Sequence, residues 1–466
     1  MVRPEHRRGE LPQTRDAYRE LTRIALPSVI EMVLMALIGS IDTIMIGGLD
    51  QNAAAAVAAV GLTGQPRMLM LSIFFALNIG VTAVVARRKG QGLREDANRS
   101  LRSALVLIVG LSLALAAIAL PLAPFLLRLA GANESTLDMA VTYFSILAWF
   151  LPINALTMCI NAAQRGVGNT RITLYTNVAS NVVNVFMNWV LIYGHLGFPR
   201  LGVAGAAYAT GIGFAVGGGM ALFSLMGRHA EGSFLYLSLR DDWRVRRDAV
   251  TPVMKVGGNA MLEQVALRIG FFTYAAIIGH MGKVPYAAHT IAMQFLNISF
   301  SFGDGIGIAA TSLVGQMMGR QRPDLSVVYG KCAQRMALVV SLALAIGIAI
   351  FRHPLSSMFL SGEDADKAAV LALAANVMFM VALFQPFQTS SVVISGCLRG
   401  AGDNLYVAAV MMICVTGIRP LLSALAVYGL HLNLVAAWGA SLIDMAVRLT
   451  LVYIRFSGGK WHDIKV

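Results

Sequence analysis

Long apolar runs constrain this chain more than any other feature of its sequence. Each run lasts roughly 20 residues or more, which is the length that a helix needs to cross the hydrocarbon of a membrane. The runs alternate too little for barrel strands, and a backbone inside hydrocarbon must satisfy its own hydrogen bonds. We therefore predict an all-α membrane protein with twelve transmembrane helices. Their spans are 18–46, 57–86, 103–127, 138–161, 172–194, 203–226, 250–280, 286–318, 336–351, 368–396, 405–429 and 433–454.

Composition supports this prediction. Of the 466 residues, 57% are hydrophobic and only 13% are charged, whereas an ordinary soluble domain is about a quarter charged. A water-soluble enzyme, a disordered chain, a collagen-like fibre and a disulfide-rich secreted module are therefore excluded. The four cysteines lie in or beside apolar runs and form no CxxC, which indicates buried apolar residues rather than a redox or metal site. They are Cys159, Cys332, Cys397 and Cys414.

The positive charge of the chain follows its predicted topology. Most of the 37 Lys and Arg residues fall on one side of the membrane if both termini are cytoplasmic, as the positive-inside rule requires. The net charge of +13 is thus explained without a nucleic-acid partner, and we predict a multi-pass protein of the inner or plasma membrane. The charged first 20 residues contain no apolar core, so we expect no cleaved signal peptide.

The second half of the sequence resembles the first. QRGVGNTR begins at Gln164 and CLRGAGDN begins at Cys397, so that Arg165 and Arg399 match at an offset of 234. Glu31 and Glu263 match at an offset of 232. Because six spans is an even number, the halves share one orientation and are related by an axis along the membrane normal. Two such bundles with a site between them are typical of transporters.

The repeat predicts the domain organisation. We expect a cytoplasmic segment, a six-helix bundle, a linker, a second six-helix bundle and a cytoplasmic tail. The linker either lies on the cytoplasmic surface or is a solvated connection. The predicted boundaries are 1–17, 18–226, 227–249, 250–454 and 455–466.

Several charged residues fall inside predicted spans. A charge in the hydrocarbon costs roughly 2.5–3.5 kcal/mol on insertion scales, so each needs a functional or structural reason. Glu31 and Asp42 are eleven residues apart and share one face of their helix, which Pro27 is positioned to kink. Asp304 lies in the glycine-rich stretch SFGDGIG, where a span can bend. Asp444 precedes another charge by four residues and predicts a structural ion pair with Arg448.

The fifth span carries a stripe of amides. The spacings of 4, 3 and 4 residues place four asparagines on one face of a helix. They either bond neighbouring helices together or form a polar ladder that faces Asp42 across a cavity. The four are Asn177, Asn181, Asn184 and Asn188.

Taken in order, several motifs resemble those of multidrug and toxic compound extrusion (MATE) transporters. They are IALPSVIEMVLMALIGSIDTIMIGGL, QRGVGNT, NVVNVFMNWVLIYG, LGVAGAAYAT, GIAATSLVGQMMG, CLRGAGDN and RFSGGKW. The resemblance covers nearly the whole chain. It implies two pseudo-symmetric six-helix bundles that form a V-shaped cleft. It also implies an antiporter, without cofactors and expected as a monomer, that exports organic cations as H+ or Na+ enters.

The resemblance also assigns roles to individual residues. Asp42 and Glu263 match cation-coupling positions of the family, and Na+ is expected near one of them if sodium is the coupling ion. Asn188 and Gln388 stand where some relatives carry aspartate. These departures leave the coupling ion open, although the pair of Glu31 and Asp42 favours the proton. Arg165 and Arg399 belong to a repeated motif and are assigned a structural role.

Two alternatives remain from the sequence. A lipid-linked oligosaccharide flippase shares this architecture, but it should carry more basic residues in its cleft to hold pyrophosphate. A membrane-embedded enzyme should carry a convergent set such as HExxH, which is absent here. The phosphate-binding motif GxxxxGK[ST] is also absent, which argues against an ATP-driven pump.

Overall fold

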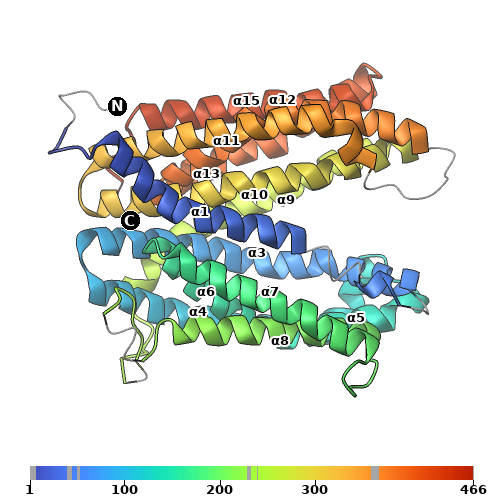
Figure 1. Ribbon diagram of the computed structural model, residues 1–466, viewed down its shortest axis with the longest axis horizontal. Coiled ribbons are helices and arrows are strands. Elements are labelled where there is room, and N and C mark those ends of the chain that lie inside the picture. Colours follow the sequence, from blue (N-terminus) through green and yellow to red (C-terminus); the bar gives the residue numbers. More distant parts are fainter. Residues whose placement is uncertain are drawn as a thin grey trace. The chain divides into compact units, whose positions relative to one another are not determined.

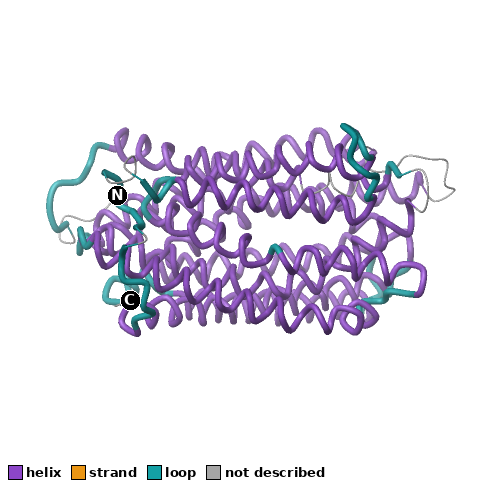
Figure 2. Tube along the Cα trace, turned by 90° about the horizontal axis from the view of Figure 1, so that it is seen from below, coloured by secondary structure: helices purple, strands orange, loops and turns teal. Residues whose placement is uncertain are grey.

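A computed structural model describes residues 7–38, 45–49, 53–227, 232–238, 240–357 and 367–464 of the chain. Within these ranges the regular structure is helical and contains no strand (Figure 1). Figure 2 shows long helices joined by short loops. The predicted all-α class is therefore confirmed, as expected where the backbone must satisfy its own hydrogen bonds.

Most of the helices follow one another with few intervening residues, and the longest connection lies between α8 and α9. The first half contains α1 (Thr14–Ile38), α3 (Ala53–Gln91), α4 (Arg94–Leu129), α5 (Glu134–Trp149), α6 (Leu151–Gly166), α7 (Thr170–Tyr193) and α8 (Gly202–Phe223). The second half contains α9 (Arg247–Gly279), α10 (Lys283–Gly319), α11 (Pro323–Ser357), α12 (Lys367–Ala401), α13 (Asn404–Met411), α14 (Arg419–Ala424) and α15 (Leu434–Ser457). Two π-helical stretches, η3 (Met412–Ile418) and η4 (Leu425–Gly429), continue α13 and α14 without a break.

Most of these helices are suited to a membrane. In the described part of the chain, nine are long and apolar enough to cross one, if Asn404–Gly429 is taken as a single helix. Helices α5 and α6 pass the same test together and are bent by 50° at their junction. Helix α7 is not among the nine because its asparagines lower its hydropathy. Helix α1 is not among them either, and its predicted span continues into residues outside the described ranges.

The chain divides into two compact units, which we describe separately. Unit 1 comprises Met1–Val33 and Gly258–Val466, and unit 2 comprises Leu34–Gly257. This division differs from the predicted bundles at their leading ends. The first part of α1 belongs with the second half of the chain, and the first part of α9 belongs with the first half. The linker belongs to unit 2.

Apolar packing explains this assignment. In unit 1, Leu21 and Ile24 of α1 are buried in one core with Ile306 and Leu313 of α10. In unit 2, α9 approaches α3 so closely that a Cβ atom at Gly80 would lie 2.4 Å from the carbonyl oxygen of Val253. The leading ends are therefore packed against helices that are remote in the sequence. The predicted bundle boundaries themselves stay a prediction.

The internal repeat extends to individual hydrogen bonds. The hydroxyl of Thr82 on α3 donates to the carbonyl oxygen of Ala162 on α6 over 2.9 Å. The hydroxyl of Thr311 on α10 makes the equivalent bond to Gly396 on α12 over 2.8 Å. The turns that follow α6 and α12 also share one backbone pattern, in which each arginine carbonyl accepts from a glycine three residues later. Similar sequences thus form the same contacts in both halves.

Close packing at the repeat generates a prediction about Gly400. A Cβ atom at this position would lie 2.3 Å from the backbone oxygen of Thr311 on α10. Overpacking of this kind costs about 1–3 kcal/mol. Thermal denaturation in detergent should therefore show a lower Tm for Gly400→Ala than for the wild type. Gly347→Ala on α11 is the control, because its Cβ would meet no other described atom within 4 Å. Equal Tm values would contradict the packing described here.

Candidate functional site

A buried ion pair joins α9 and α12 in unit 1. Glu263 of α9 is 1% exposed, and both of its carboxylate oxygens accept hydrogen bonds from the guanidinium of Arg399. The Nε–Oε2 distance is 3.3 Å, and the second bond runs from Nη2 to Oε1. Two-point pairing of this kind fixes the orientation of both groups. The sequence had assigned Arg399 a structural role only.

The positions of both partners follow from local structure. The hydroxyl of Thr416, in the π-helical stretch η3, donates to the carbonyl oxygen of Ala266 over 2.7 Å. A Cβ atom at Gly270 would lie 2.3 Å from the carbonyl oxygen of Val415. Helix α9 is thus held against η3 one turn beyond Glu263. Arg399 lies in the last turn of α12, where its carbonyl accepts from the amide of the following turn.

Two further carboxylates lie in the same unit. Asp304 of α10 is exposed and interacts electrostatically with both Arg399 and Glu263. Next to it, α1 lies against α10, because a Cβ atom at Gly305 would be 2.5 Å from the Cα atom of Val29. Glu31 follows two residues later and is 1% exposed. Unit 1 therefore contains the three carboxylates predicted for coupling or for the cavity that lie in the described residues, and the arginine that pairs with one of them.

A second buried ion pair differs from the predicted one. Asp444 of α15 accepts from Nε and Nη2 of Arg419, at 2.9 and 2.6 Å, and not from Arg448. Both partners are almost fully buried. Arg419 also lies over the rings of Phe271 and Tyr274. The predicted pair was based on spacing along one helix, but a guanidinium from a neighbouring helix reaches the same carboxylate with two hydrogen bonds.

Arg448 is buried, and its hydrogen bonding is incomplete within the described chain. Its Nη1 atom donates to the sulfur of Met411 over 3.4 Å, while Nε and Nη2 have no hydrogen-bond partner among the described residues. It interacts electrostatically with Asp444 and with Glu263. Arg448 therefore contributes positive charge close to both ion pairs without completing either of them.

The predicted amide stripe lies on α7 in unit 2. Asn184 donates to the hydroxyl of Thr210 on α8 over 3.1 Å, and Asn188 donates to Asn184 over 3.4 Å. Asn181 donates to the backbone oxygen of Asn177 over 2.8 Å. Asn184 therefore bonds α7 to α8, as expected if the amides hold neighbouring helices together.

Other predicted residues are more scattered. Pro27 lies inside α1, and Arg165 occupies the last turn of α6, where Arg399 stands in α12. Gln388 is fully buried on α12, and its amide atoms have no hydrogen-bond partner in the described chain. Asp42 lies outside the described residues. In the described ranges no group of three or more His, Cys, Asp and Glu residues is arranged to hold a metal ion.

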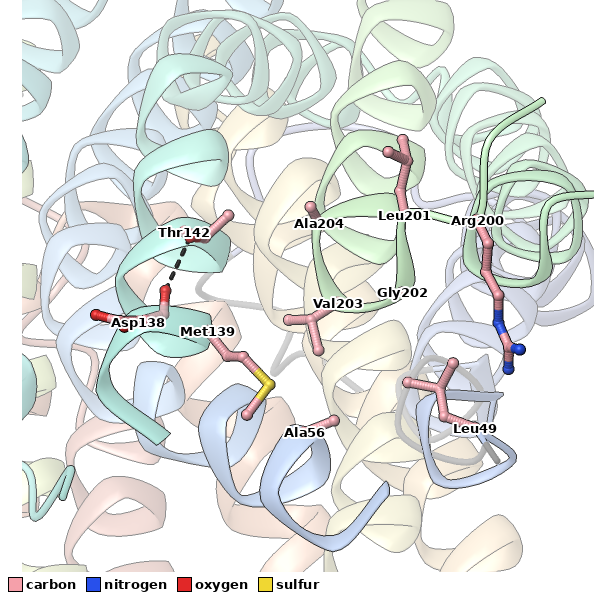
Figure 3. Close-up of a pocket in the computed structure, with 10 residues that line it drawn as sticks. All are labelled: Leu49, Ala56, Asp138, Met139, Thr142, Arg200, Leu201, Gly202, Val203 and Ala204. Carbon is pink, nitrogen blue, oxygen red and sulfur yellow. Dashed lines mark hydrogen bonds between the residues drawn. The ribbon is translucent and has the colours of Figure 1, made fainter. Parts of the chain in front are cut away.

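Unit 2 contains a cavity that the sequence did not predict. Its volume is about 630 Å³, and it opens between the starts of α5 and α8 (Figure 3). Asp138 and Arg200 are the charged residues of its lining. Thr142 donates to the backbone oxygen of Asp138 over 2.8 Å. None of the predicted site residues lines this cavity.

Comparison with known proteins identifies the family. The sequence model named MatE matches residues 27–190 and again residues 260–425, which together cover well over half of the chain. The chain belongs to the MatE family. The resemblance to MATE efflux transporters is thereby confirmed, and the two matching regions coincide with the two halves of the internal repeat.

This MatE protein is similar to curated transporters over nearly the whole length of both chains. The "Probable multidrug resistance protein NorM" of Thermotoga maritima is 27% identical over 97% of this chain and 94% of its own. The "Uncharacterized transporter YisQ" of Bacillus subtilis is 26% identical over 97% and 96%. The protein is thus a multi-pass membrane transporter rather than an enzyme.

Solved structures share the MatE fold. A crystal structure of MATE in complex with MaL6 is 22% identical, with a TM-score of 0.87 over 95% of this chain and 97% of that chain. A MOP superfamily transporter from Pyrococcus furiosus is 21% identical, with a TM-score of 0.87 over 97% and 98%. In that transporter, reverse polarity of the binding pocket suggests a different function.

The Glu263–Arg399 pair generates a stability prediction. Glu263→Gln or Arg399→Gln should each lower the free energy of unfolding by about 3–5 kcal/mol, because each leaves one charge buried without its partner. The double substitution should cost less than the sum of the two. Denaturation of all four proteins in detergent measures the coupling. Asp242→Asn is the control, since its pair with Arg246 is about half exposed. Additive effects would show that the two residues do not stabilise each other.

Proposed function

We propose that this MatE protein is a secondary active antiporter that exports organic cations, drugs among them, in exchange for H+ or Na+. The supporting observation is the charge of the site in unit 1. Arg399 pairs with Glu263, the exposed carboxylate of Asp304 adds a negative charge beside this pair, and Glu31 lies on the neighbouring helix α1. A carboxylate that is not neutralised attracts a lipophilic cation, whereas it repels an anion.

The coupling follows from competition for the carboxylates. A proton or Na+ that binds a carboxylate cancels its charge and weakens its hold on a cationic substrate. Substrate and coupling ion then leave and enter in alternation, and the ion gradient drives export by alternating access. We propose Glu263, Glu31 and Asp42 as the cation-coupling residues. Asp304, Gln388 and the asparagines of α7 line the substrate path in this proposal.

The proposed architecture is that of twelve transmembrane helices in two pseudo-symmetric bundles around a V-shaped cleft. Helices α1 and α7, together with the bent pair of α5 and α6, complete the count beside the nine apolar helices. Both termini are cytoplasmic in this proposal, because that places most Lys and Arg residues in the cytoplasm. The protein works in the inner or plasma membrane as a monomer.

A lipid-linked oligosaccharide flippase is the second candidate, and the charge of the site argues against it. A pyrophosphate-linked lipid requires a surplus of basic groups where it binds. Arg399 is paired with Glu263 and Arg419 with Asp444, so neither guanidinium is available to hold a pyrophosphate, and Asp304 adds a negative charge beside the first pair. The membrane-embedded enzyme is excluded by membership in a transporter family.

Transport in liposomes tests the proposed function. Purified protein should move a cationic dye such as ethidium when ΔpH or ΔpNa is imposed, and each gradient applied alone identifies the coupling ion. Liposomes without a gradient are the control and should show no net accumulation. If neither gradient drives the dye while a fluorescent lipid-linked oligosaccharide crosses the bilayer, the flippase is the correct function.

The two aligned glutamates should differ in importance. Glu263→Gln should lower the initial rate of dye transport at least tenfold, because it removes the carboxylate that matches a family site and pairs with Arg399. Glu31→Gln should reduce the rate less. Initial transport rates, measured with equal amounts of each variant in the liposomes, show which substitution is more damaging. Glu134→Gln, at an exposed position, is the control. A larger loss for Glu31→Gln would place the coupling site on α1.

A further inference from the structure

The segments that precede α1 and α9 occupy equivalent places in the internal repeat, and both are docked. We call residues 7–13 the N-terminal strap and residues 232–238 with 240–246 the linker strap. Each is followed by a helix whose leading part belongs to one unit and whose remainder belongs to the other, since the division passes through α1 after Val33 and through α9 after Gly257. Each strap is therefore joined directly to the leading end of such a helix.

The N-terminal strap lies over the turn between α10 and α11 in unit 1. The backbone N–H of Arg8 donates to Oδ2 of Asp324 over 3.1 Å, and its guanidinium donates to the carbonyl oxygen of Gln321 over 3.4 Å. Arg322 donates to the carbonyl oxygen of Glu10 over 2.9 Å. Asp324 and Arg322, which hold the strap, also bond each other. Asp324 accepts two hydrogen bonds of 2.9 Å from Arg322.

This strap is held mainly by polar contacts at the surface. Residues 7–10 are exposed, and Leu11 is only partly buried against the core of unit 1. Asp324, which accepts from Arg8, is buried, but it keeps its two hydrogen bonds from Arg322 when the strap leaves, and water replaces the hydrogen bonds of the exposed strap residues. The N-terminal strap can therefore detach at low cost.

The linker strap is held differently on α4 in unit 2. Leu235 and Leu237 are each 1% exposed. The side chain of Asn98 accepts from the amide of Tyr236 over 2.9 Å and donates to the carbonyl oxygen of Phe234 over 3.2 Å. Apolar side chains that are removed from water must be rehydrated before the strap can leave.

A buried arginine adds to the attachment of the linker strap. Arg102 of α4 donates to Asp241 of the strap over 2.8 Å and to Glu95 over 2.6 Å. Its side chain is 6% exposed. Without the strap, this buried arginine would keep only Glu95, which is largely exposed, as a partner, so the contact with Asp241 also opposes release. Equivalent segments of the repeat thus have unequal attachments.

We propose that the N-terminal strap is a releasable latch on the leading part of α1, whereas the linker strap is a permanent anchor for α9. This inference rests on the transport cycle proposed above, in which α1 carries Glu31. Release of Arg8 and Glu10 from the α10–α11 turn frees α1 to shift against α10 near Gly305, beside Asp304. Helix α9 keeps its leading end fixed while Glu263 exchanges ligands.

Matched cross-links test the proposal. One variant carries Arg8→Cys with Gln321→Cys, and the other carries Phe234→Cys with Arg94→Cys, whose native side chain donates to the Phe234 carbonyl over 3.3 Å. All four native cysteines are buried, so a bismaleimide that a reductant can cleave should react at the introduced pairs. Cross-linking the N-terminal strap should slow dye transport in liposomes at least ~10-fold, because it blocks a gating motion, and cleavage should restore the rate. Cross-linking the linker strap should leave the rate within about twofold.

Each other outcome overturns part of the proposal. Full transport by the protein with a cross-linked N-terminal strap would show that no latch opens, and arrest by the linker cross-link would show that the second strap also moves. Backbone hydrogen exchange on the unmodified protein gives a readout that is independent of transport. The amide of Arg8 should exchange at least ~100-fold faster than that of Tyr236, and equal rates would contradict the latch. If no dye moves before cross-linking, the proposed function fails, while hydrogen exchange still decides the inference about the straps.

Discussion

Exclusion of water from the interior of a membrane protein is the constraint on which this structure depends. A backbone amide without water must bond within its own helix, and a charge without water must find a partner in the chain. The first requirement explains why the described residues form helices and no strands. The second explains why the guanidinium of Arg399 reaches Glu263 and that of Arg419 reaches Asp444. The first pair joins helices that are far apart in the sequence and the second joins neighbouring helices, so the same charges also tie unit 1 together.

The charge balance of unit 1 gives the ion pairs a chemical consequence. Arg399 neutralises Glu263, yet Asp304 and Glu31 add two carboxylates to the same unit. An exposed carboxylate such as Asp304, beside a pair that is already neutralised, can accept a cation or a proton. The Asp444–Arg419 pair is more deeply buried than the Glu263–Arg399 pair, because its arginine is 2% exposed and Arg399 is 20% exposed. It is therefore better suited to hold helices than to exchange ligands, since losing either partner is costly.

The internal repeat shows how one packing scheme supports different chemistry. Thr82 and Thr311 make equivalent hydrogen bonds to α6 and α12, and the turns after those helices have the same backbone pattern. The side chains around this shared framework differ. Unit 2 carries the amides of α7, whereas unit 1 carries the carboxylates and arginines. The segments that lead into the two repeats differ as well, since one is held by exposed polar groups and the other by buried leucines and Arg102.

The sequence by itself determined the helical class, the repeat and the family, because these depend on local properties. The length of an apolar run, the spacing of residues on one helix and a recurring motif can all be read along the chain. Tertiary structure alone decided that Arg399 pairs with Glu263 across 136 residues, that Arg419 rather than Arg448 reaches Asp444, and that both straps are docked. Which guanidinium meets which carboxylate depends on how far each helix is rotated and how closely it packs. Those quantities are set by contacts such as Gly270 against Val415, which link residues from separate parts of the chain and leave no periodic trace in the sequence.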